Sequence, residues 1–151
     1  DIVHLHRGYV SDCTRMFSAG KLSNEWMERL DDMIEIRNKV VSSLGSGDNC
    51  SKTWEIGSEL AKEMGYENNL MGMSPDKSSF LGHSVGLELD ETPVIAKGFD
   101  RPLNYGGIMA IEPKVIFDNG CIGTEDTFVR TRNGMEYITM GDKFPFITDW
   151  N

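Results

Sequence analysis

The 151 residues, 39% of them hydrophobic, suit one folded domain with its own core. The 24 acidic and 15 basic residues give a formal net charge of -9, and no basic run occurs, which argues against nucleic acid as a partner. Because no apolar run approaches the roughly 20 residues that cross a bilayer, we expect a soluble, cytoplasmic protein without membrane contact.

The first half of the chain predicts a hairpin followed by two amphipathic helices. Residues 1–17 alternate as two extended runs around a turn at Arg7-Gly8. Ser23 is suited to cap a helix over residues 24–44, in which apolar residues recur at helical spacing. A second amphipathic helix follows, and we expect Ser51 to cap it.

The second half is rich in segments with β-like composition. A polar loop over residues 67–79 precedes an extended run at 80–89. Segments 108–117, 121–131 and 135–139 are separated by turn sequences and predict consecutive antiparallel strands. Since helices and strands do not alternate along the chain, the sequence predicts an α+β architecture rather than a doubly wound parallel sheet.

Three acidic residues stand out because they lie within apolar, strand-like segments: Asp12, Glu112 and Glu125. Burial of a carboxylate is costly unless it meets a cation or several hydrogen-bond donors, so metal coordination is one explanation for them. An ion pair or a partly exposed strand position is the alternative for each acid alone. His83, between Gly82 and Ser84, is by itself equally compatible with a hydrogen-bonded turn residue.

Taken in order, four segments resemble the metal-site motifs of the pita-bread metallopeptidases, the family of methionine aminopeptidase, aminopeptidase P and prolidase. The segments are DIVHLHRGYVSDCTRMF, GHSVGLELDETP, AIEPKVIF and GTEDTFV. The resemblance implies a pita-bread fold with a mixed, mostly antiparallel curved sheet and two helices. It also implies that residues 1–151 are the C-terminal portion of a catalytic domain whose N-terminal half lies upstream of Asp1, where the sequence opens inside an apparent strand without an initiating Met.

By the same resemblance, two divalent metal ions would be held by five residues: Asp1, Asp12, His83, Glu112 and Glu125. Asp1 would chelate one ion, Asp12 and Glu125 would bridge, and His83 and Glu112 would complete the second site. Glu112 would also handle the proton of the attacking water. A ligand set rich in oxygen with one imidazole suits Mn²⁺, Co²⁺ or Fe²⁺, and is compatible with Zn²⁺.

One candidate catalytic position departs from the family pattern. Asp90, in LELDE, stands where many relatives carry a second histidine seven positions after the first. An ionised aspartate cannot donate a hydrogen bond to a developing oxyanion, so its role is altered or carried by another residue.

The resemblance is nearest to the peptidases that cleave next to proline. It implies a dinuclear metal-dependent exopeptidase, of the Xaa-Pro dipeptidase or Xaa-Pro aminopeptidase type, which acts on a peptide or dipeptide with proline at the second position. The full-length protein is expected to be a homodimer. The alternatives are a catalytically inactive pita-bread module that binds peptides or proteins, which Asp90 keeps open, and a creatinase-like hydrolase, which intact metal ligands disfavour.

Overall fold

The structure, a computed structural model, describes residues 1–141 and 147–149. The first half contains β1 (Ile2–His6), β2 (Tyr9–Cys13), β3 (Met16–Ser18), α1 (Asn24–Ser46) and α2 (Cys50–Glu63). The second half contains β4 (Phe80–Ser84), β5 (Glu91–Ala96), β6 (Ile108–Ile111), β7 (Lys114–Phe117), β8 (Gly120–Gly123), β9 (Asp126–Thr131), β10 (Gly134–Tyr137) and β11 (Ile147–Asp149). Neither helix has the length and apolar character needed to cross a membrane.

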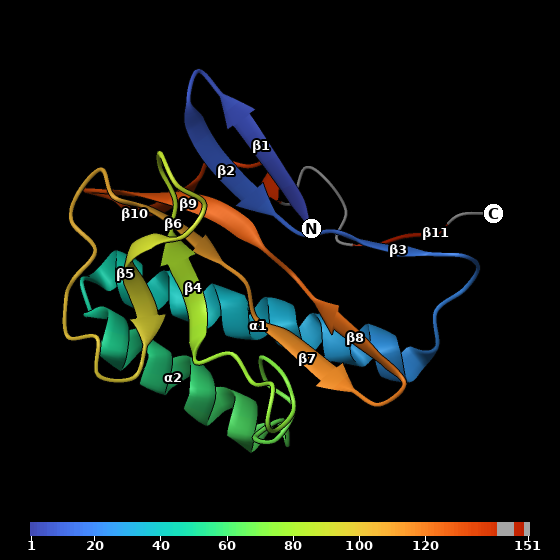
Figure 1. The fold of residues 1–151 in the computed structure, drawn as a ribbon. Helices are drawn as coiled ribbons and strands as arrows, with labels where there is room; N and C mark the ends of the chain where they lie inside the picture. The colour runs from blue at the N-terminus through green and yellow to red at the C-terminus, as the bar shows by residue number, and fades with distance from the viewer. Residues whose placement is uncertain (142–146, 150–151) are drawn as a thin grey trace.

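An antiparallel sheet with the strand order β10-β9-β6-β4-β5 forms the centre of the molecule, and both helices cover one of its faces (Figure 1). The core lies between these two layers. Leu30, Met33 and Ile36 of α1 are buried there together with Met109 and Phe128 of the sheet. Three two-stranded pairs surround the sheet: β1 with β2, β7 with β8, and β3 in parallel with β11. The predicted α+β class is confirmed.

Local sequence signals place the helices, with one correction. Ser23 caps α1 as predicted, since its hydroxyl accepts a hydrogen bond from the Trp26 amide, and Gly47 ends the helix with φ of 100°. The prediction that Ser51 caps α2 is wrong. Asn49 is the cap, because its side chain accepts from the Lys52 amide at 2.8 Å, whereas the Ser51 hydroxyl accepts from the Gly98 amide at 2.9 Å.

Several predicted strands are shorter than the sequence pattern suggested. Strand β4 ends at Ser84, and the predicted strand over 108–117 divides into β6 and β7 at Glu112-Pro113. Proline lacks the backbone N–H that a sheet ladder requires, so a break at this position has a direct cause. The predicted strand over 121–131 likewise divides at Thr124-Glu125 into β8 and β9, and β5 is a strand that the sequence analysis missed. Two of the expected metal ligands, Glu112 and Glu125, therefore lie at strand breaks.

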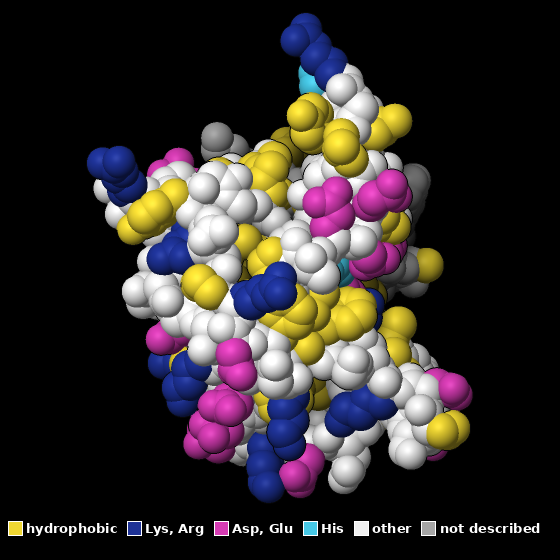
Figure 2. All heavy atoms as spheres, turned by 60° about the vertical axis from the view of Figure 1, so that its left-hand side comes forward, with side chains coloured by type: hydrophobic (Ala, Val, Ile, Leu, Met, Phe, Trp, Pro, Cys, Tyr) yellow, Lys and Arg dark blue, Asp and Glu magenta, His cyan; other side chains and the backbone are white. Residues whose placement is uncertain are grey.

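The hairpin of β1 and β2 projects from the body of the molecule and carries hydrophobic side chains (Figure 2). Every residue of β1 is exposed, including Ile2, Val3 and Leu5. In contrast, Asp12 near the end of β2 is buried where the hairpin meets the sheet. The base of this hairpin is thus the part that joins the fold.

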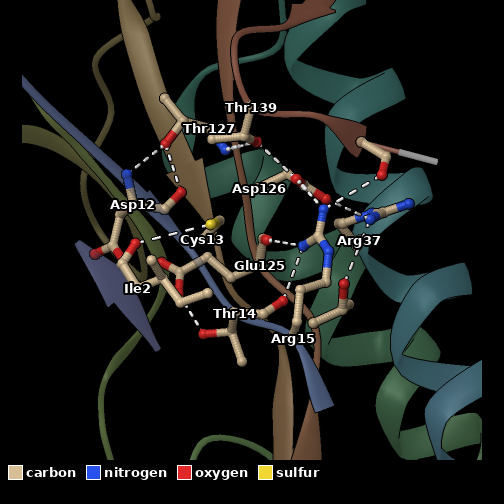
Figure 3. A network of polar contacts seen from close by, with 12 residues as sticks. Ile2, Asp12, Cys13, Thr14, Arg15, Arg37, Glu125, Asp126, Thr127 and Thr139 are labelled. Carbon is tan, nitrogen blue, oxygen red and sulfur yellow. Dashed lines mark hydrogen bonds and ion pairs between the residues drawn. The ribbon is translucent and has the colours of Figure 1, made fainter. Parts of the chain in front are cut away.

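A buried charge network connects the hairpin base, the sheet and α1 (Figure 3). The fully buried carboxylate of Asp126, in β9, accepts hydrogen bonds from Arg15 at 2.8 Å, from Arg37 of α1 at 2.9 Å and from the Thr139 hydroxyl at 2.6 Å. Two guanidinium groups and one hydroxyl satisfy this carboxylate. The network holds three separate parts of the chain at fixed positions beside Glu125.

We expect the Asp126→Asn substitution to destabilise the protein by about 3–5 kcal/mol, because it leaves two buried guanidinium groups facing a neutral amide. Urea unfolding measures this change in the free energy of unfolding. The control is Glu25→Gln, which removes the helix-surface ion pair of Glu25 with Arg29 and is expected to cost about 0–1 kcal/mol. Equal losses in the two variants would contradict a structural role for the network.

Candidate metal centre

The centre begins with two carboxylate residues that adjoining strands bring together. Asp12, in β2, is 4% exposed, and Glu125, at the break before β9, is 2% exposed. The Thr127 hydroxyl accepts from the Asp12 amide at 3.0 Å and donates to the Asp12 carbonyl at 2.7 Å. The Thr14 amide in turn donates to the Glu125 carbonyl at 3.2 Å. These cross-strand bonds fix the backbone of each acidic residue against the other segment.

Further hydrogen bonds orient Glu125 itself (Figure 3). The Thr14 hydroxyl donates to Oε2 of Glu125 at 2.7 Å, and the Arg15 guanidinium donates to its backbone carbonyl at 2.9 Å. The side chain of Glu125 is therefore held at one carboxylate oxygen, and its backbone is held by the same arginine that binds Asp126. Hydrogen bonds of this kind fix the orientation of a carboxylate that could bind a metal ion.

His83 enters the centre from β4, which lies very close to β6. A Cβ atom on Gly82 would lie 2.3 Å from the Ala110 carbonyl oxygen, so only glycine permits this approach. The Nδ1 atom of His83 lies 3.2 Å from the Ser84 carbonyl oxygen and 3.3 Å from a carboxylate oxygen of Asp90. Both of these neighbours are acceptors, and the tautomer with its proton on Nδ1 would satisfy them and leave the lone pair of Nε2 for a metal ion.

Three of the expected ligands converge. Among residues 1–141 and 147–149, Asp12, His83 and Glu125 offer ligand atoms that all lie within 4.8 Å of one another. Glu112 adjoins them, with Oε1 at 3.5 Å from Nε2 of His83 and Oε2 at 2.6 Å from Nζ of Lys114. Asp1 is exposed, and no contact described in the structure joins its carboxylate to the other four residues.

Burial and the proximity of the acidic side chains to one another make their ionised forms less stable. Burial, and then the charges of Glu112 and Asp12, raise the pKa of Glu125 to about 8. Burial also raises the pKa of Asp12, although the neighbouring His83 lowers it in part. In the described part of the chain, Oδ1 of Asp12 is buried without a hydrogen-bond partner. A divalent cation would satisfy this oxygen and offset the negative charge, so the residues present fit a metal ion.

Asp90 lies at the edge of the centre rather than within it. Its side chain is 68% exposed and approaches the Nδ1 side of His83, away from the Nε2 lone pair. An aspartate in this position can accept a hydrogen bond from the Nδ1–H group of the imidazole. A carboxylate that does so orients the ring of a histidine that binds a metal through its other nitrogen. A catalytic role for Asp90 stays a prediction from the sequence.

The sequence analysis missed the side chains that hold the ligands. Thr14 and Lys114 each follow an expected ligand by two positions, and Thr127 follows Glu125 by two. Residues two apart in the strands that the sequence predicts would lie on the same face, so this spacing is the signal that could have found them, although the structure breaks these strands at Glu112 and Glu125. Arg15 and Arg37 carried no such signal, because their partner Asp126 is distant in the sequence.

Known proteins resemble this chain in sequence and in fold. The chain is 28% identical over 144 residues to an Xaa-Pro dipeptidase of Pyrococcus furiosus, a match that covers 95% of this chain and 39% of the relative. The prolidase structure from Pyrococcus furiosus superposes with a TM-score of 0.79 and 29% identity, covering 89% of this chain and 38% of that one. An X-Pro aminopeptidase structure from Thermotoga maritima has a TM-score of 0.84 at 24% identity, covering 97% and 40%, and shows the likeness of fold.

The chain thus spans about two fifths of the length of the curated relatives named here. These structural neighbours confirm the pita-bread fold that the sequence motifs implied. The sequence model of metallopeptidase family M24 matches residues 1–132, which include all five expected ligands and Asp90. The chain therefore belongs to metallopeptidase family M24.

Proposed function

We propose that this chain carries the metal centre of an exopeptidase of the Xaa-Pro dipeptidase or Xaa-Pro aminopeptidase type. The observation that carries the proposal is the convergence of Asp12, His83 and Glu125 in a buried cluster that contains an unsatisfied carboxylate oxygen. Buried carboxylates of raised pKa around one imidazole are a costly arrangement without a cation. They are a favourable arrangement around a divalent ion.

The proposed centre holds two ions of Mn²⁺, Co²⁺ or Fe²⁺, with Zn²⁺ also compatible with the donor set. Asp12 and Glu125 would bridge, His83 and Glu112 would complete one site, and Asp1 would reach the other. When bound, the ions supply Lewis-acid polarisation of the scissile carbonyl and make water a nucleophile near neutral pH.

The protein side chains then have separate tasks. His83 binds through Nε2 while Ser84 and Asp90 hold its Nδ1 side. Thr14 holds Oε2 of Glu125 through the hydrogen bond that its hydroxyl donates. Glu112, whose Oε1 lies 3.5 Å from Nε2 of His83, is the residue proposed to take the proton of the attacking water and return it to the leaving amine.

The proposed substrate is a peptide or dipeptide with proline at the second position. Its support is the similarity to relatives that include an Xaa-Pro dipeptidase and a prolidase. Assembly of the full-length protein as a homodimer and a cytoplasmic location stay predictions from the sequence resemblance.

The first test is hydrolysis. We expect the intact protein to cleave an Xaa-Pro dipeptide with Mn²⁺ or Co²⁺ and to lose activity with a chelator. His83→Ala, which removes the sole imidazole of the cluster, is expected to lower kcat/KM and Mn²⁺ affinity by at least about 100-fold, beyond the range typical of outer-shell changes. His6→Ala, on the exposed hairpin, is the control and should leave both unchanged.

An intact protein that binds no Mn²⁺ and turns over no dipeptide would sink the peptidase proposal. That result would favour the alternative of an inactive module that binds peptides or proteins.

A second test uses the stability of the metal-free protein. The pKa of Glu125 rises on folding from 4.5 to about 8, so the folded state binds more protons than the unfolded state between these values. The free energy of unfolding should then fall as pH rises through this window, by up to about 1.4 kcal/mol per pH unit. Urea unfolding from pH 5 to 8 measures the slope.

Glu125→Gln is the matched variant and should reduce that slope, because the amide does not ionise. Saturating Mn²⁺ should also reduce it in the wild-type protein, since a bound cation favours the carboxylate form. A metal-free protein whose stability is level across the window would be inconsistent with a buried, uncompensated Glu125.

A further inference from the structure

Two of the three histidines in the chain, His4 and His6, take no part in the proposed metal centre and lie on one strand, β1. They are two positions apart. Side chains with this spacing in a strand point to the same face, and their Cα atoms are about 6.5 Å apart. The antiparallel register sets His4 opposite Ser11 and His6 opposite Tyr9. Both imidazoles therefore lie on the face of the hairpin that Ser11 and Tyr9 share.

The two imidazoles are available to a ligand. Every residue of β1 is exposed, and within residues 1–141 and 147–149 neither histidine has a hydrogen bond, an ion pair or a ring contact. Exposed side chains turn among their χ1 and χ2 rotamers, so the two rings can approach each other above the strand. A metal ion with metal–nitrogen bonds of about 2.0–2.1 Å needs neighbouring ligand nitrogens roughly 3 Å apart. Side-chain rotation alone brings the rings to that separation.

We propose that His4 and His6 form a second metal site, which chelates Cu²⁺ through one ring nitrogen of each residue and binds Zn²⁺ less tightly. Imidazole suits both ions, and Cu²⁺ binds most tightly among the divalent ions of the first transition row. The site is the strand counterpart of two histidines at i and i+4 on a helix, which also share one face. Water fills the remaining coordination positions, because the hairpin face is open to solvent.

This hairpin site is separate from the proposed metal centre. Asp12 pairs with Val3, which precedes His4 in β1, so the Asp12 side chain lies on the opposite face of the hairpin. The donor atoms also differ. The cluster of Asp12, His83 and Glu125 combines one imidazole with two carboxylates, whereas the hairpin pair offers two imidazoles. Metal binding at the hairpin thus does not depend on the proposed peptidase function.

The test is electron paramagnetic resonance of the intact, metal-free protein with Cu²⁺. The bound ion should show hyperfine coupling to two imidazole nitrogens, whereas the cluster described at the proposed centre contains a single imidazole. His4→Ala and His6→Ala should each remove the two-nitrogen coupling. Each should also lower the Cu²⁺ affinity measured by calorimetric titration by about 100-fold, since the second ligand of a chelate binds at a high effective concentration.

A matched control exchanges two neighbours, His4→Leu together with Leu5→His. The exchange keeps the number of histidines and the composition of β1, but it places the imidazoles at positions 5 and 6, on opposite faces of the strand. We expect this variant to lose the two-nitrogen coupling and as much Cu²⁺ affinity as His4→Ala loses.

The inference is overturned if Cu²⁺ bound to the wild-type protein shows no coupling to two imidazole nitrogens. It is equally overturned if the exchanged variant binds Cu²⁺ with wild-type affinity, because the shared face of the two histidines would then have no part in binding.

Discussion

The close approach of two buried carboxylates, those of Asp12 and Glu125, is the constraint around which the rest of the site is arranged. Burial, and then the charges of Glu112 and Asp12, raise the pKa of Glu125 to about 8, because like charges in a poorly hydrated place repel. Hydrogen bonds from Thr14 and Thr127 and a guanidinium from Arg15 hold the two segments together against this repulsion. The protein thus holds several carboxyl groups close together in a buried place, where a bound cation would favour their ionised form.

The elements that follow local rules could be predicted from the sequence. Helix α1 has its serine cap and its apolar spacing, and the hairpin turns where Arg7-Gly8 permits positive φ. The strands were predicted too long, because Glu112-Pro113 and Thr124-Glu125 interrupt them and a composition pattern does not register these interruptions. The cap of α2 was misplaced by two residues, because the Ser51 hydroxyl binds Gly98, a partner 47 positions away that no local pattern reveals.

The site was predicted from the order of its motifs rather than from any residue alone. Asp12, His83 and Glu125 meet, and Glu112 adjoins them, whereas Asp1 stays exposed outside the cluster. The sequence could not reveal the contacts that depend on tertiary distance. These include the ion pair of Lys114 with Glu112 and the position of Asp90 on the Nδ1 side of His83. Both contacts place a charged group beside a candidate metal ligand. The order of the ligand motifs in the sequence carries no information about such neighbours.

The bonds between Asp12 and Thr127 close a loop of 115 residues, which has a consequence for the order of folding. Helices and short hairpins rest on local contacts and form early, whereas contacts between opposite ends of the chain carry the greatest loop-closure entropy and form late. The proposed metal centre therefore has no counterpart in the unfolded chain and would form only once these segments have met. By mass action, a cation bound at that centre would shift the equilibrium towards the folded state, so metal binding and folding would be linked.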